Sequence, residues 1–151
     1  MTIAARLQDL GIELPKAAAP VASYRPLVVS GDMVFVSGQL PFVDGELVTG
    51  KLGDTVDLET GQTAARACGL MILAQLQAAG LLERVAQVVK LGGFVSSTPD
   101  FTQQPQVVNG ASDLMAEVFG EKGQHARAAV GVPVLPLDAA VEVDAVLALT
   151  A

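Results

Sequence analysis

The stretch AAVEVDAVLAL, residues 139–149, carries the clearest secondary-structure pattern in the chain. Successive side chains of a β-strand point to opposite faces of a sheet, so its period of two predicts a strand with one buried face. Glu142 and Asp144 fall on the other face, about 7 Å apart. The face predicted to be buried holds Ala139, Val141, Val143, Ala145, Leu147 and Leu149.

Patterns on the N-terminal side of this stretch predict the rest of the sheet and its helices. Thr60 is the expected N-cap of the longest helix, and Gly80 is its expected stop. The order of the elements predicts an α+β fold, a two-layer sandwich in which a mixed sheet carries two helices on one face, with an extra N-terminal helix. Strands are expected over 27–30, 33–40, 46–48 (an edge strand), 85–95, 127–134 and 139–149, and helices over 2–10, 60–79 and 106–119.

The composition limits the classes of function that the chain can have. Its 151 residues are 51% hydrophobic and 17% charged, which fits one folded domain with a sizeable core. The net charge of −7 matches a nucleic-acid backbone poorly, so no nucleic-acid partner is expected. Cys68 is the single cysteine, which excludes an internal disulfide, and we expect it to be a small buried hydrophobe.

Neither a signal peptide nor a membrane span is predicted. The N-terminal stretch contains Asp9 and Glu13 and has no long apolar centre. The longest uncharged apolar stretch, residues 67–82, is interrupted by glutamines and glycines and is shorter than the roughly 20 residues that a spanning helix needs. We therefore expect a cytoplasmic protein with no membrane partner.

Most familiar catalytic and cofactor motifs are missing from the sequence. No phosphate-binding or dinucleotide-binding glycine motif, HExxH or CxxC occurs, and one His with one Cys cannot form a usual zinc site. No metal and no cofactor are therefore expected. The chemistry-bearing residues that remain are Tyr24 with Ser37, Asn109, the segment around Arg127, and Glu142.

Taken together, these segments resemble the Rid/YjgF family of reactive-intermediate (enamine/imine) deaminases, also labelled endoribonuclease L-PSP. The resemblance covers residues 22 to 149, and six pieces occur in the family's order. They are Tyr24 followed by Ser37-Gly38-Gln39-Leu40-Pro41, then Ala78-Ala79-Gly80-Leu81, Asn109, Ala126-Arg127, Leu135-Pro136, and Val141-Glu142-Val143-Asp144-Ala145.

The resemblance implies a chorismate-mutase-like fold and a homotrimer with clefts between neighbouring subunits. It divides the chain into an N-terminal helix and connector, residues 1–21, and a Rid/YjgF-like domain, residues 22–151. It places Arg127 and Glu142 at the reacting centre, and Tyr24, Ser37 and Asn109 in the cleft. Two departures from the family pattern are His125, where the family has Pro, and Ala129, where deaminase members often have Cys.

The expected reaction is hydrolysis of a small imine or enamine that bears a carboxylate. A planar guanidinium at Arg127 would hold the carboxylate bidentately, and Glu142 would orient or deprotonate the attacking water. Tyr24 and Ser37 would shape the cleft wall. His125, two residues before Arg127, is expected on the same face, with its ring about 6–8 Å from the guanidinium and able to contact the ligand.

Other readings of the same residues stay open. Arg127 can be an ordinary surface cation, Glu142 part of a solvated face, and Asn109 only a hydrogen-bonding residue at a helix start. A trimer with the same cleft can also bind a small anion without catalysis. The third alternative is a ribonuclease, which the net charge of −7 and the lack of paired histidines disfavour.

Overall fold

The computed structural model describes residues 1–20 and 22–151, and its secondary structure confirms the predicted α+β class. Five strands form one sheet in the order β1-β2-β7-β5-β6. Only β5 and β6 are parallel, so the sheet is mixed. The elements are α1 (Ile3–Asp9), β1 (Leu27–Ser30), β2 (Met33–Gln39), β3 (Phe42–Val43), β4 (Glu46–Leu47), α2 (Leu58–Ala78), β5 (Val85–Ser96), α3 (Gln104–Phe119), β6 (Ala126–Val132) and β7 (Val141–Leu149).

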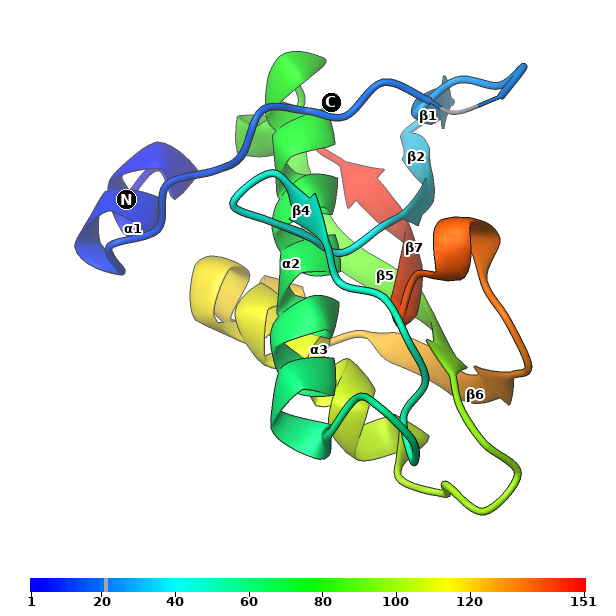
Figure 1. Cartoon of the computed structure of the whole chain (residues 1–151). Coiled ribbons are helices and arrows are strands. Elements are labelled where there is room, and N and C mark those ends of the chain that lie inside the picture. The colour runs from blue at the N-terminus through cyan, green and yellow to red at the C-terminus, as the bar shows by residue number, and fades with distance from the viewer. Residues whose placement is uncertain (21) are drawn as a thin grey trace.

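Helices α2 and α3 cover one face of the sheet, and the core lies between the two layers (Figure 1). Strand β7 is central, and its buried residues alternate with half-buried ones along its whole length. The residues that the period of two assigned to the core within β7 are therefore buried. Cys68 is also fully buried on α2, as expected, and this burial raises the pKa of its thiol.

Neither α2 nor α3 covers the opposite face of the sheet, which leaves apolar side chains in solvent. Val28 on β1 is 52% exposed, Phe35 on β2 is 48% exposed, and Val130 on β6 is 45% exposed. We call this face the open face. Large exposed apolar side chains of this kind are common on surfaces through which proteins associate or bind ligands.

The expected starts of both long helices were wrong. The N-cap of α2 is Asp57, whose carboxylate accepts a hydrogen bond from the Thr60 amide at 2.8 Å, so the helix begins at Leu58. Helix α3 begins at Gln104, and Asn109 therefore lies inside the helix instead of opening it. Pro105 at the first turn explains the earlier start, because proline there lacks only an amide that would have no helical partner.

The short strand expected over 46–48 is present as β4 (Glu46–Leu47), but it is not an edge strand of the main sheet. β4 pairs only with β3 in a separate two-stranded sheet, and Thr49 bridges to Ala139 instead of continuing a strand. Strand β7 accordingly begins at Val141, two residues later than its sequence pattern indicated. The paired residues Phe42 and Leu47 of this hairpin pack against a small separate cluster of Leu40, Leu135 and Ala139 instead of extending the main sheet.

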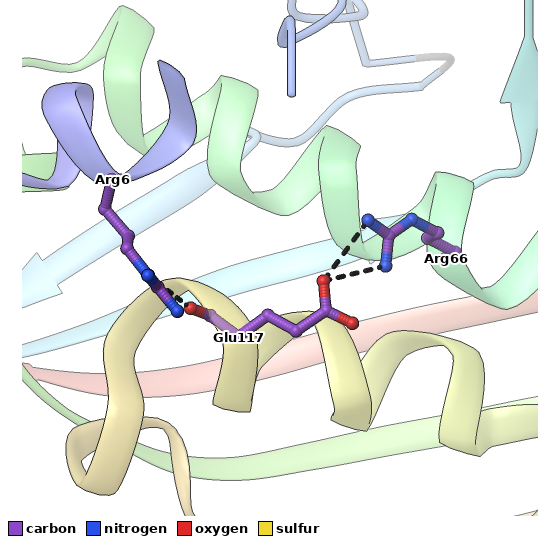
Figure 2. Close-up of polar contacts among 3 residues, drawn as sticks. All are labelled: Arg6, Arg66 and Glu117. Atoms are coloured by element: carbon purple, nitrogen blue, oxygen red, sulfur yellow. Dashed lines mark hydrogen bonds and ion pairs between the residues drawn. The ribbon is translucent and has the colours of Figure 1, made fainter. Parts of the chain in front are cut away.

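The N-terminal helix is fastened to the domain by charged groups. The carboxylate of Glu83 accepts hydrogen bonds from the amides of Ile3 and Ala4, at 2.8 and 2.9 Å. Figure 2 shows that Arg6 donates to the backbone carbonyl of Glu117 on α3, while Arg66 of α2 pairs with the carboxylate of the same residue at 3.5 Å. The expected domain boundary falls at Val21, which lies outside the described residues.

No helix in residues 1–20 and 22–151 combines the length and the hydropathy that crossing a bilayer requires.

Candidate functional site

Arg127 lies on the edge strand β6 and projects toward helix α3. It pairs in register with Leu91 of β5, which is fully buried under the helices, so the two side chains share the helix-covered face. Its Nη1 donates to Asn109 Oδ1 at 2.8 Å and to Ser112 Oγ at 3.1 Å, and its Nη2 donates to the Pro105 carbonyl at 3.3 Å. Three groups of one helix therefore fix the plane of the guanidinium.

These three bonds leave a defined part of the guanidinium available. Arginine has five N–H donors and no acceptor. Within the described residues, the Nε–H and one N–H of Nη2 have no hydrogen-bond partner. Those two donors are on neighbouring nitrogens, which is the fork that binds a carboxylate bidentately. The part of Arg127 that remains unbonded is thus suited to one planar carboxylate.

His125 lies next to this guanidinium, as its position two residues before Arg127 predicted. Its Nε2 is 2.9 Å from Ser112 Oγ, which also accepts from Arg127 at 3.1 Å, so Nε2 and Nη1 are within about 6 Å of each other. Its Nδ1 is 2.6 Å from the Gly123 carbonyl oxygen. Both ring nitrogens are therefore engaged by the protein, and contact of His125 with a ligand stays a prediction.

Ser112 is the residue of this cluster that the sequence analysis missed. It lies three positions after Asn109, and residues three apart in a helix share a face. The hydroxyl side chain of Ser112 on the same helix face as Asn109 was the sequence feature that could have indicated its part in the cluster. We call Asn109, Ser112, His125 and Arg127 the arginine cluster.

A second group of predicted residues lies around the end of β2. The pairing of β2 with β7 shifts by one residue between Val36 and Gln39, and Ser37 and Gly38 form this bulge. The Ser37 hydroxyl donates at 2.7 Å to the carbonyl of Arg25, the residue that follows Tyr24. Tyr24 is 45% exposed and lines a small cavity together with Gly38. Bulges commonly redirect side chains next to functional sites.

Gly38 brings Glu142 into this group. A Cβ built on Gly38 would lie 2.6 Å from Glu142 Oε2, so the carboxylate occupies space that any other residue at position 38 would fill. The close contact explains why glycine stands between Ser37 and Gln39. We call Tyr24, Ser37 and Glu142 the glutamate cluster.

Two buried glutamines hold the bulge in place from inside the protein. Gln75 of α2 donates from the same Nε2 to the Ala18 carbonyl at 2.7 Å and to Gln39 Oε1 at 3.2 Å. Gln39 in turn donates to the Ser37 carbonyl at 2.9 Å. This chain of bonds connects the N-terminal connector to the glutamate cluster, and neither glutamine was singled out from the sequence.

The carboxyl group of Glu142 has a raised pKa. Burial is the main cause, and the nearby charge of Asp144 on the same strand face adds to it. Burial also raises the pKa of Asp144. A carboxyl group whose pKa is moved toward neutrality is better suited to exchange protons with a substrate or water.

The two clusters do not meet within one chain. Arg127 is in register with Leu91 and Ala145 on the helix-covered face, whereas Glu142 is in register with Phe94 on the open face. Strand β5 also separates β6 from β7, a distance of about 10 Å between strand axes. The fold therefore places the predicted site residues in two separate groups. Among the described residues, no three His, Cys, Asp or Glu side chains gather as metal ligands would.

Comparison with known proteins identifies the relatives of this chain. A family model described as "YjgF/chorismate mutase-like, putative endoribonuclease" matches residues 4–148. Protein TCP17 of Trypanosoma cruzi is 57% identical over 150 residues, which are 97% of this chain and 94% of that protein.

Solved structures show the same fold over nearly the whole chain. A Shewanella oneidensis protein described as an endoribonuclease is 36% identical, with a TM-score of 0.94 over 99% of this chain and 100% of its own. Protein Atu1372 of Agrobacterium tumefaciens is 46% identical, with a TM-score of 0.89 over 99% and 93%. RidA from a Psychrobacter species is 29% identical, with a TM-score of 0.63 over 89% and 94%. The first two matches are long enough to include α1, so the N-terminal helix is shared with those relatives.

Proposed function

The chain belongs to the YjgF/chorismate mutase-like family, and we propose that it hydrolyses small reactive enamine or imine intermediates that bear a carboxylate, at clefts between the copies of a homotrimer. The observation that carries the proposal is the guanidinium of Arg127. Helix α3 fixes its plane through three hydrogen bonds, and its remaining donors form a carboxylate-binding fork. In an imine made from an amino acid, the carboxylate adjoins the electrophilic C=N carbon.

The proposed reaction adds one water and releases ammonia. With the carboxylate on Arg127, water attacks the C=N carbon, its proton passes to the nitrogen, and the C–N bond of the resulting carbinolamine breaks to leave a carbonyl compound. Glu142 would accept the proton from water and return it to the departing nitrogen, and its raised pKa supports that role. Positioning of this kind can lower a barrier by several kcal/mol. The step requires neither a metal nor a cofactor.

The homotrimer is proposed because one chain cannot complete this site. The arginine cluster and the glutamate cluster lie on opposite faces of the sheet, and strand β5 stands between their strands. Both can flank one ligand if a neighbouring copy supplies one of them. The exposed apolar residues of the open face support association between copies. Light scattering should therefore give three times the 15.5 kDa of one chain, and a monomer at micromolar concentration would contradict the cleft.

The decisive assay uses 2-aminoacrylate generated in the cuvette, with semicarbazide competing for the imine. Wild-type protein should divert the intermediate from semicarbazide, and Arg127→Ala should lose this activity while keeping its oligomeric state. Arg127→Lys should restore little, since an ammonium lacks the two-pronged geometry. Full activity in the Ala variant would refute the assignment.

The same assay decides between catalysis and simple anion binding. A trimer that only binds a small carboxylate would retain an Arg127-dependent affinity for propionate without accelerating loss of the imine. A ribonuclease function, which the family description names, is disfavoured by the net charge of −7. RNA cleavage that survives in the Arg127→Ala variant at physiological salt would reverse that judgement.

A further inference from the structure

A chain of three hydrogen bonds connects Arg127 to the protein backbone through Ser112 and His125. Arg127 Nη1 lies 3.1 Å from Ser112 Oγ, Ser112 Oγ lies 2.9 Å from His125 Nε2, and His125 Nδ1 lies 2.6 Å from the Gly123 carbonyl oxygen. The participants come from β6, from α3 and from the short turn between them.

The chemistry of the two end groups sets the direction of every bond in this chain. A guanidinium only donates, so the Ser112 oxygen accepts from Arg127. A carbonyl oxygen only accepts, so Nδ1 carries the ring hydrogen and donates it to Gly123. In the neutral ring this leaves Nε2 without hydrogen, so Nε2 accepts the hydrogen of the Ser112 hydroxyl.

The Gly123 carbonyl, at which this series of hydrogen bonds ends, is held in place by the packing of its turn. Gly123 is buried in the turn Gly120–Gly123, and a Cβ at this position would lie 2.1 Å from the Met115 carbonyl oxygen of α3. The turn is thus pressed against the helix that also carries Ser112. Ser112 and Gly123 therefore belong to one packed unit of helix and turn, and bonds to both can hold the guanidinium in one orientation.

We propose that Ser112 and His125 are positioning residues for Arg127, and that by occupying Nη1 together with Asn109 they restrict the site to a ligand that offers a single carboxylate to the Nε and Nη2 edge. Because it concerns how Arg127 meets a carboxylate, this inference rests on the proposed function. It differs from the expectation for His125 made from the sequence, since the imidazole acts through Ser112 and does not contact the ligand.

The first experiment needs no ligand and uses nuclear magnetic resonance on the full-length protein. His125 is the only histidine, so its ring signals need no assignment. At a pH where the ring is neutral, the nitrogen spectrum should show hydrogen on Nδ1. Rotation about the Nε–Cζ bond of Arg127, identified by the loss of its signals in Arg127→Ala, should be slow in wild type and about tenfold faster in Ser112→Ala, the change expected from losing one hydrogen bond.

The second experiment titrates wild type and variants with propionate, a stable carboxylate. Ser112→Ala and His125→Leu should raise the Kd for propionate by about tenfold. His125→Gln should recover much of the affinity, because its side-chain oxygen can accept from Ser112. Asp113→Asn, on the next residue of the same helix, is the matched control and should bind like wild type. Far-UV circular dichroism checks that each variant is folded.

The outcomes separate this inference from the proposed function. Hydrogen on Nε2, or an unchanged rotation rate in Ser112→Ala, overturns the positioning role whether or not propionate binds. Slow rotation with hydrogen on Nδ1, but no propionate binding by wild type, upholds the positioning role and overturns both the carboxylate ligand and the proposed function. Equal affinity in wild type and His125→Leu overturns the contribution of His125.

Discussion

The arginine cluster and the glutamate cluster differ in their charge and in the groups that surround that charge. At the edge of the sheet, the charge of Arg127 is met by three acceptors from α3, and no described carboxylate lies within ion-pair distance. On the open face, Glu142 and Asp144 are half-buried beside each other, and both have a raised pKa. The first cluster is prepared to receive a negative charge, whereas the second is prepared to hold or release a proton.

Because of this difference, neither cluster alone provides both an anion-binding group and a base. A cation that is held only by neutral groups keeps its attraction for an anion, but it offers no base. A pair of desolvated carboxyl groups offers a base, but it repels a carboxylate ligand. The proposed reaction on a carboxylated imine would need both groups around one molecule, and the sheet keeps them on opposite faces.

The largest expected effect comes from charging the open face. Phe35→Asp places a carboxylate on the exposed apolar patch, and burying it between copies would leave an unpaired charge. We expect a folded monomer of 15.5 kDa without deaminase activity. Light scattering and circular dichroism measure the two properties separately. A trimer formed by this variant would show that the patch is not the contact surface.

The next test mixes two inactive variants, Arg127→Ala and Glu142→Gln. If each cleft takes Arg127 from one copy and Glu142 from its neighbour, random reassembly of an equal mixture restores complete clefts at about a quarter of all positions. The activity should therefore rise from near zero to about a quarter of the wild-type value. If both residues act from the same chain, mixing restores nothing.

A smaller effect is expected from Gly38→Ala. The added methyl group would lie 2.6 Å from Glu142 Oε2 and would push the carboxylate aside. Displacement of a catalytic group by about 1 Å can reduce kcat about 100-fold. The affinity for propionate, which depends on Arg127, should not change. Loss of propionate binding in this variant would mean that the two clusters are not independent.

The smallest effect is a pH-dependent gain in stability from Glu142→Gln. Because the folded state raises the pKa of Glu142 above its ordinary value of 4.5, ionisation of this group works against folding. Wild-type stability should thus fall as the pH rises from the ordinary pKa through the raised one. The variant should melt up to a few degrees higher than wild type at pH 8, and at the same temperature at pH 4. Asp144→Asn should behave in the same direction.

Melting curves of wild type and both variants at the two pH values measure this difference. An advantage of the variant at pH 4 that disappears at pH 8 would contradict the raised pKa. We thus expect ionisation of Glu142, which its proposed catalytic role requires, to lower the free energy of unfolding.

The sequence predicted the elements whose signals are local. The period of two in β7, the apolar helix α2 and the glycine stop at Gly80 each depend on residues within a few positions of one another, and each is present in the structure. The closeness of His125 and Arg127 follows from their spacing of two. The early start of α3 and the Asp57 cap were missed because several polar residues before each helix could accept from its first free amides. Only the conformation of the folded loop selects which residue does so.

The site residues were also predicted unevenly. The resemblance to the family named Arg127, Asn109, Ser37, Tyr24 and Glu142, but residue types and spacing did not divide them into two clusters. Ser112, Gln39 and Gln75 were missed because nothing in their local sequence distinguishes a hydroxyl or an amide that bonds across the fold from one that faces solvent.

The sequence by itself determined the buried face of β7, the apolar helices and the presence of one arginine in a family-like segment, since these depend on the order of residues along the chain. Only the tertiary structure decided that Arg127 and Glu142 face opposite sides of the sheet. The face of a side chain follows from counting residues within its own strand, but comparing two strands requires their register. That register is fixed by long-range pairing of β6 with β5 and of β5 with β7, which no local pattern encodes.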